Sequence, residues 1–279
     1  MYILMFLYFV LYFVVYFVYL QFYKNKISLS SILLLYTLII YTLILFFLYV
    51  DIYKYPKCIY DTKIQTDTCF DNINNYINKI SVVTLKYIFI YIPSVLLLFY
   101  ILKIRNTYSP FFNKKLNIFL FILLYFIFSF ITEFISYINH RILHLKLFFK
   151  FHEEHHKYIS PCAFSALDGS PVEIFFWNLL PSFIAPFIFG IDIYFVYTII
   201  LFGLITSILS HAGYRIIDLG FINNAHHDLH HERMKCNYSS PIIDYLMGTY
   251  IYREPKKIYA KFDKKIKDIS GSFNNKCNI

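Results

Sequence analysis

Long apolar runs separate short polar segments along the first half of the chain. Four runs lack any charged residue, and they cover residues 1–23, 27–50, 87–102 and 116–132. A helix needs about 20 apolar residues to cross the roughly 30 Å hydrocarbon core of a bilayer. The runs therefore predict membrane-spanning helices in two hairpins, the second built from residues 80–102 and 116–138. The first run is longer than the apolar core of about 7 to 15 residues in a cleavable signal peptide, so we expect a retained span.

The apolar stretch at residues 173–210 has a different pattern. Pro181, Pro186, Gly190 and Asp192 interrupt it, and a proline inside a helix removes a backbone hydrogen bond and kinks or ends the helix. We expect two short helices of the re-entrant kind here, in place of one long span. From His211 onward the chain is polar, and we expect it to end in a soluble region.

Composition sets the fold class. Hydrophobic residues make up 58% of the chain and charged residues 15%, against roughly 25% charged residues in ordinary soluble domains. The sequence predicts an all-α polytopic membrane protein, whose helical hairpins (about four spans and the re-entrant pair) are capped by a cytosolic helical domain. We predict three regions: transmembrane hairpins at 1–138, a histidine-bearing region with its apolar hairpin at 139–252, and a basic cytosolic tail at 253–279.

The net charge of +9 includes many basic residues in the tail that begins at Arg253. Lys and Arg are enriched on the cytosolic side of membrane proteins, so we interpret the tail as charge beside anionic lipid, and no nucleic-acid motif accompanies it. The same orientation puts a basic loop, with Lys103 and Arg105, in the lumen, against that tendency. We give more weight to the histidine chemistry, which needs a cytosolic reductant.

Five cysteines are spread along the chain without any CxxC pair or zinc-finger spacing. Such spacing gives no sign of a metal site or a redox motif. We expect free thiols. Cys58 and Cys69 share one loop and could pair if that loop were lumenal, but the preferred topology makes it cytosolic.

All ten histidines lie between His140 and His231, which is a far tighter grouping than chance produces. Three clusters hold nine of them: His140 and His144; His152, His155 and His156; His226, His227, His230 and His231. Positions i, i+3 and i+4 share one helix face, so each cluster can aim two or three imidazoles at one point. Imidazole is the commonest metal-binding side chain, and this number of rings suits two metal ions better than one.

Imidazole binds zinc, iron, copper and nickel alike, so ligand type leaves the metal open. A zinc hydrolase keeps about three protein ligands per metal, fewer than this chain offers, and no nucleophilic Ser or Cys motif is present. Redox-active metals beside membrane spans suit the oxidation of lipid C–H bonds by O2. A non-catalytic metal-binding membrane protein or a metal transporter is the alternative from a different class, although transporters hold their ligands near the bilayer midplane.

Several motifs in this region carry a resemblance to a known family. They read His140-Arg-Ile-Leu-His144, His152-Glu-Glu-His155-His156, Pro171-Val-Glu173, His211-Ala-Gly-Tyr214 and His226-His227-Asp228-Leu-His230-His231. Over about residues 130–250 the chain resembles the sterol desaturase and fatty acid hydroxylase superfamily, and within it the C4-methylsterol oxidase branch looks nearest. One departure is that relatives often read His-Pro before the acidic residue, where this chain has Ser170.

The resemblance implies an enzyme of the endoplasmic reticulum membrane that uses O2 and two iron ions, with electrons from NAD(P)H by way of cytochrome b5 and its reductase. It implies nine ligands: His140, His144, His152, His155, His156, His211, His227, His230 and His231. His226 points about 100° away from His227 on a helix, so a supporting or exposed position competes with ligation there. The substrate is a membrane lipid, either a sterol or a fatty-acyl lipid, and the runner-up is an acyl-lipid desaturase or fatty acid hydroxylase. The resemblance fits hydroxylation and desaturation equally.

Further expectations concern residues around the clusters. Glu133, Asp228 and Asp244 are candidates to accept an imidazole N–H and so orient a ligand. We expect Glu153 and Glu154 to be solvated and Lys86 to reach toward the headgroups. Tyr214, Asn237 and Tyr238 are expected to organise loops around the last cluster, and the loop at 51–79 to carry no chemistry.

Overall fold

The regular secondary structure of the described residues is helical, apart from one isolated β-bridge between Lys63 and Tyr214. The structure, a computed structural model, describes residues 2–65, 73–106, 115–216 and 225–252. The α-helices are α1 (Tyr2–Asn25), α2 (Leu29–Tyr53), α3 (Lys57–Tyr60), α4 (Ile73–Lys86), α5 (Ile92–Asn106), α6 (Ile118–Leu143), α7 (Leu180–Phe189), α8 (Ile193–His211), α9 (Ala225–Arg233) and α10 (Pro241–Leu246). Two π-helical turns, η1 (Tyr87–Tyr91) and η5 (Glu173–Leu179), and three 3-10 turns, η2 (Phe149–Phe151), η3 (His155–Lys157) and η4 (Ala163–Leu167), complete the order.

Four helices among the described residues are long and apolar enough to cross a membrane: Leu29–Tyr53, Asn74–Ile104, Ile118–Leu143 and Ile193–His211. This confirms the predicted all-α polytopic class. The run at 1–23 is helical as well, within α1.

The second of these spans is one continuous rod made of α4, η1 and α5. Pro93 lies in its second half and has no N–H to donate. Just before it, the Ile92 N–H donates to the Tyr87 carbonyl, five residues back, which is the wider π-helical pattern. The widened turn lets the helix pass the proline without ending.

The apolar stretch from Glu173 divides into a short helix and a full-length one. The first, Glu173–Phe189, is too short to be a candidate span and ends at Gly190, whose φ of 63° is the left-handed conformation that glycine adopts readily. Asp192 then caps α8 by accepting from the Tyr194 N–H at 3.1 Å. The expectation of two short helices is therefore wrong for the second, because every interruption lies before α8 begins.

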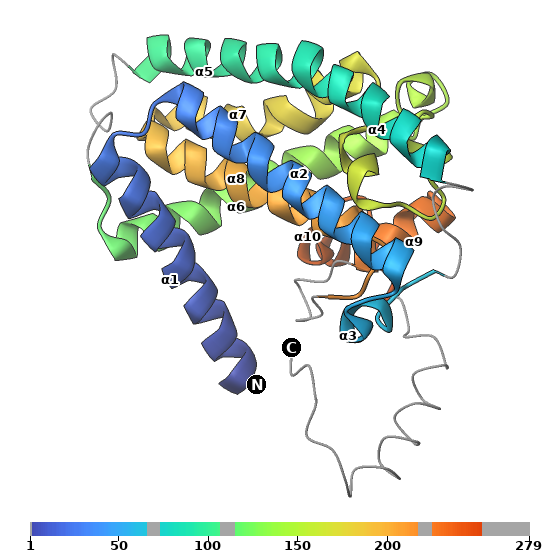
Figure 1. The fold of residues 1–279 in the computed structure, drawn as a ribbon. Helices are drawn as coiled ribbons and strands as arrows, with labels where there is room; N and C mark the ends of the chain where they lie inside the picture. The colour runs from blue at the N-terminus through green and yellow to red at the C-terminus, as the bar shows by residue number, and fades with distance from the viewer. Residues whose placement is uncertain (1, 66–72, 107–114, 217–224, 253–279) are drawn as a thin grey trace, which may run out of the picture.

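α8 lies at the centre of the bundle, packed against α1, α2, α7 and η4. A buried hydrogen bond, from the Tyr36 hydroxyl to the Tyr197 carbonyl at 2.6 Å, joins α2 to α8. Figure 1 shows α2, α6 and α8 running alongside one another, with α5 beyond them. The last turns of α2, α6 and α8 reach the same end of the molecule as α9 and α10.

The loop after α2 folds back onto this same end. Its Ile64 N–H donates to the Gly213 carbonyl and its Thr62 carbonyl accepts from the Arg215 N–H, both at 2.8 Å. The loop therefore borders the histidine region, which its polar and nearly neutral sequence did not reveal.

Two cysteines depart from the expectation of free thiols. Cys58, in α3, and Cys162 are each disulfide-bonded, whereas Cys236 is free and buried. Pairing depends on which side chains the fold brings within a few ångströms, and local spacing carries no such information. Cys69 and Cys277 lie outside the described residues.

Candidate metal centre

Four separate segments bring the histidines to one end of the bundle. α6 carries His140 in its last turn and is followed at its C-cap by His144, and His211 is the last residue of α8. The segment after α6 supplies His152, His155 and His156, and α9 supplies the rest. Residues that lie far apart in the sequence thus meet where two membrane helices stop.

Five histidines form the first group, which we call cluster A: His140, His144, His152, His156 and His230. One ring nitrogen from each lies within 4.8 Å of all the others. The Nε2 atoms of His140 and His152 are 2.9 Å apart, and His230 Nε2 lies 3.1 Å from His156 Nε2 and 3.2 Å from His144 Nε2. The five nitrogens therefore face a common centre.

Four histidines form cluster B by the same criterion: His155, His211, His227 and His231. His211 Nε2 lies 3.2 Å from His155 Nε2 and 3.1 Å from His227 Nε2. Both ring nitrogens of His231 are buried with no hydrogen-bond partner among the described residues. Buried polar atoms almost always have a partner, so a bound metal ion fits the place that His231 faces.

The two clusters are adjacent and interleaved. The rings of His156 in cluster A and His231 in cluster B have centroids 4.9 Å apart. Each sequence cluster aims two imidazoles at one centre: His140 with His144 and His152 with His156 at cluster A, and His227 with His231 at cluster B. The remaining members, His155 and His230, face the other centre. Residues 152–156 lie in turns and 3-10 helix and not in an α-helix, so helical face geometry does not apply to them.

In most of these histidines, the ring nitrogen that faces away from the cluster is hydrogen-bonded to the protein. Nδ1 contacts are made by His140 with the Tyr238 carbonyl (2.5 Å), His152 with Glu173 Oε1 (2.9 Å), His155 with the Asp168 carbonyl (3.1 Å), His211 with the Ser207 carbonyl (2.8 Å) and His230 with the Cys236 carbonyl (2.7 Å). Each partner is an acceptor, so Nδ1 carries the proton and donates. Nε2 is left as a lone pair facing the cluster, which is how proteins orient metal-binding histidines.

Burial keeps these imidazoles neutral. It lowers the pKa of His144 to about 4 and lowers the pKa values of His230 and His231 well below the usual range for histidine. Burial also raises the pKa of Glu173 to about 8 and lowers that of His152. The histidines are therefore neutral, which is the form that binds metal.

His226 belongs to neither cluster. It is buried, and its Nε2 lies 3.0 Å from Asp244 Oδ2. Asp244 also accepts from the backbone N–H groups of Tyr238 and Ser239, both at 2.8 Å. Since the Tyr238 carbonyl accepts from His140, the His226–Asp244 pair supports cluster A through that loop.

The other two carboxylates expected to orient ligands make different contacts. Glu133 accepts from the Ser239 hydroxyl at 2.7 Å and touches no histidine, so that expectation is wrong. Asp228, between two ligands on α9, accepts from Gln65 Nε2 at 2.9 Å. Glu173 orients a ligand instead, namely His152. The only indication of this in the sequence is that Glu173 is the acidic residue of the motif that follows Ser170.

Ser170 holds the segment that contains Glu173. Its hydroxyl donates to the Phe151 carbonyl at 2.7 Å and accepts from the Glu173 N–H at 3.2 Å. The serine that replaces the expected histidine therefore ties the turn before His152 to the start of η5.

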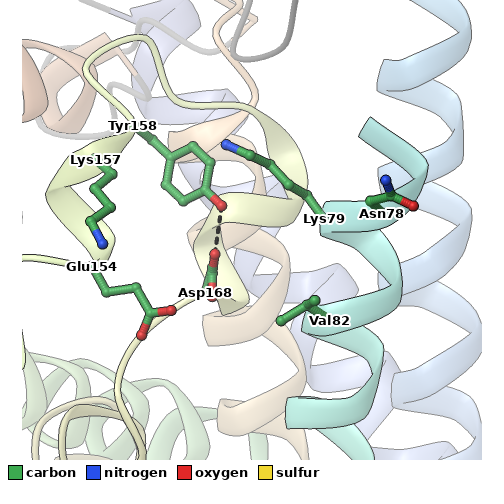
Figure 2. A pocket seen from close by; sticks show the side chains of 7 residues that line it. All are labelled: Asn78, Lys79, Val82, Glu154, Lys157, Tyr158 and Asp168. Carbon is green, nitrogen blue, oxygen red and sulfur yellow. Dashed lines mark hydrogen bonds between the residues drawn. The ribbon is translucent and has the colours of Figure 1, made fainter. Parts of the chain in front are cut away.

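A pocket of about 280 Å³ lies beside cluster B, and Figure 2 shows its lining: Asn78, Lys79, Val82, Glu154, Lys157, Tyr158 and Asp168. The Tyr158 hydroxyl donates to Asp168 Oδ2 at 2.5 Å, and Lys86 pairs with Asp168 and with Glu154. Lys86 therefore points at these carboxylates and not toward headgroups, and Glu154 is paired although it is partly exposed. The Asp168 carbonyl connects this network to His155.

The segment that carries the histidines is similar to a known protein family. Residues 125–249 match the family described as fatty acid hydroxylase. This segment contains every member of clusters A and B. Over this segment the chain is similar to that family.

Three similar proteins are named for sterol oxidation or for a fatty acid hydroxylase domain. The chain is 32% identical over 156 residues to a Δ7-sterol 5(6)-desaturase of Gibberella zeae, covering 50% of this chain and 44% of that protein. It is 33% identical over 126 residues to a methylsterol monooxygenase of Aspergillus fumigatus, covering 40% and 43%. It is 30% identical over 128 residues to fatty acid hydroxylase domain-containing protein 2 of Macaca fascicularis, covering 45% and 38%.

These matches confirm the resemblance to the sterol desaturase and fatty acid hydroxylase superfamily over the histidine-bearing segment. The chain spans less than half the length of these three relatives. No solved structure matches it.

Proposed function

We propose that this chain is an O2-dependent lipid oxidoreductase of the endoplasmic reticulum membrane, which hydroxylates or desaturates a sterol or fatty-acyl lipid at a histidine-bound di-iron centre. The observation that carries the proposal is the pair of adjacent clusters, A and B, in which neutral imidazoles converge at the end of membrane helices. The match of residues 125–249 to the fatty acid hydroxylase family and the sterol-oxidising relatives support the reaction class.

The donor set fits two irons. Five imidazoles in cluster A and four in cluster B are neutral nitrogen donors, which iron accepts. Bound iron would supply the redox chemistry with O2 that oxidation of an unactivated C–H bond requires.

The chain's own residues build the cavity for that chemistry. The carbonyls of Tyr238, Asp168 and Cys236 fix the tautomer and the direction of three ligands. Glu173 does the same for His152. Burial of the rings excludes water from the nitrogens that face the metals.

The proposed orientation puts the histidine end in the cytosol, where NAD(P)H and cytochrome b5 can supply electrons. Substrate would reach this end from the bilayer, because the ligands follow the last turns of α6 and α8.

Lipid profiling of cells that express the chain tests the proposal. We expect a hydroxylated or desaturated lipid with the native chain and with Glu153→Gln, an exposed neighbour of the ligands. We expect none with His227→Ala. Bound metal without any change in lipids would favour a non-catalytic metal-binding protein, and full turnover by His227→Ala would refute the ligand assignment.

A further inference from the structure

The segment after α9 exposes large apolar side chains where the sequence predicts a soluble region. Tyr245 and Leu246 are 67% and 62% exposed, and Met247, Ile251 and Tyr252 are exposed as well. Asp244 is the only charged residue from Pro241 to Tyr252, and it is fully buried. The surface of this segment therefore carries no charge, unlike α9 just before it, where Glu232 and Arg233 are exposed.

Contacts with α6 fix how deep this segment lies relative to the membrane. The Ser239 hydroxyl donates to Glu133 at 2.7 Å, and the Thr249 hydroxyl donates to the Tyr137 hydroxyl at 3.3 Å. The ring of Tyr137 packs edge-on against Tyr238, with centroids 5.9 Å apart. Residues 238–249 thus lie beside the stretch of α6 from Glu133 to Tyr137.

That stretch belongs to the membrane-spanning part of α6. The helix begins at Ile118, and about 20 residues from there, roughly 30 Å at 1.5 Å per residue, bring it to the neighbourhood of Tyr137. α10 therefore lies at the boundary between hydrocarbon and headgroups, on the histidine end of the bundle.

The exposed residues continue the lipid-facing surface of α6. Phe130, Phe134 and Ile138 are exposed on α6, and Leu145 and Leu147 are exposed just after it. Arg141 packs its guanidinium 5.5 Å from the centre of the Tyr238 ring. Tyrosines and basic residues together are typical of membrane interfaces.

We propose that α10 and residues 245–252 dock into the interface of the bilayer, with Leu246 and its apolar neighbours in contact with acyl chains. The occupant of this surface is membrane lipid, because the segment exposes no charged side chain of its own, lies at interfacial depth and is continuous with the lipid-facing side of α6. The one charge beside it, the guanidinium of Arg215 over the Tyr252 ring, is of the kind found at membrane interfaces. Docking holds the loop that carries Tyr238, and through it His140, at the membrane surface.

Tryptophan quenching in reconstituted full-length protein tests this proposal. The single native tryptophan is first replaced, Trp177→Phe, and Leu246→Trp is compared with Lys235→Trp, an exposed position on the polar side of the same region. We expect phosphatidylcholine brominated on the upper acyl carbons to quench Leu246→Trp strongly and aqueous iodide to quench it weakly. The pattern should be reversed for Lys235→Trp.

Two results would overturn the proposal. Strong iodide quenching of Leu246→Trp without quenching by brominated lipid would show a water-facing surface. Protection of Leu246→Trp from both quenchers would show that protein covers it, either another part of this chain or a second molecule. Tyr245→Trp repeats the test at a neighbouring exposed position, and an unchanged melting temperature shows that each variant is folded.

Discussion

His155 and His156 are consecutive residues, yet their imidazoles face different metal clusters. His155 Nε2 lies 3.2 Å from His211 Nε2 in cluster B, and His156 Nε2 lies 3.1 Å from His230 Nε2 in cluster A. The 3-10 turn at this point directs neighbouring side chains to separate centres, which a pair of metal ions requires.

Substitution of these two neighbours should therefore remove different metals. We expect His155→Ala to lose the metal of cluster B and His156→Ala that of cluster A, each variant retaining the other ion, and both to lose lipid oxidation. Metal analysis of each purified variant measures this. Loss of both ions from either variant would indicate a single cooperative site, and loss of none would contradict the assignment.

Glu173 should act on metal binding through His152, whose Nδ1 lies 2.9 Å from its carboxyl oxygen. Replacing a residue that orients a metal-bound histidine typically lowers metal affinity or activity about 10–100-fold. We expect Glu173→Ala to show a loss of this size. Glu173→Gln keeps an oxygen acceptor and should lose less, and Glu153→Gln should behave like the native chain. Equal losses in the Ala and Gln variants would mean that this hydrogen bond does not orient His152.

The His226–Asp244 pair should matter for stability. Removing one partner of a buried hydrogen bond leaves the other group unsatisfied and costs about 1–3 kcal/mol, or more where the group is charged. Asp244→Ala also frees the Tyr238 and Ser239 N–H groups, so we expect a large fall in melting temperature. Glu232→Ala, an exposed change on the adjoining helix, is the control. A melting temperature within a degree or so of the native value in Asp244→Ala would contradict the role assigned to the pair.

Asp192, at the opposite end of α8 from His211, should give a pH-dependent stability. It is fully buried, accepts from the Tyr19 hydroxyl at 3.2 Å, and burial raises its pKa to about 6 from a usual value of 3.8. The folded state therefore holds this proton more tightly than the unfolded state, and stability is lost as pH rises from about 4 through 6.

Asp192→Asn removes that charge and keeps an oxygen acceptor for the Tyr194 N–H. We expect its melting temperature to exceed that of the native chain by a few degrees at pH 7.5, with the difference vanishing near pH 4. Thermal unfolding at the two pH values measures this, with the exposed change Asp61→Asn as the control. An equal or lower melting temperature at pH 7.5 would show that burying the charged carboxylate does not destabilise the folded state.

Much of this arrangement could be predicted from the sequence. Charge-free runs predict spans because a bilayer imposes a fixed length of apolar helix. The spacing of the histidines indicates two metals, and the structure brings together all nine residues named as ligands. His226 was separated from them by the angle between consecutive residues on a helix, and in the structure it lies in neither cluster.

The remaining features depend on tertiary contacts. The division of His155 from His156 requires the non-helical backbone of that segment. Lys86 pairs with Asp168 across a long stretch of sequence, and Gln65 reaches Asp228 from a loop that carries no local motif. Neither hydrophobic periodicity nor residue spacing encodes such pairings.

The central claim is that clusters A and B each hold one iron, and the most direct measurement is the metal content of the full-length protein purified without chelators. Mass-spectrometric metal analysis should find two irons per chain in the native protein and one in His155→Ala. One ion per native chain, or zinc in place of iron in active protein, would contradict the account.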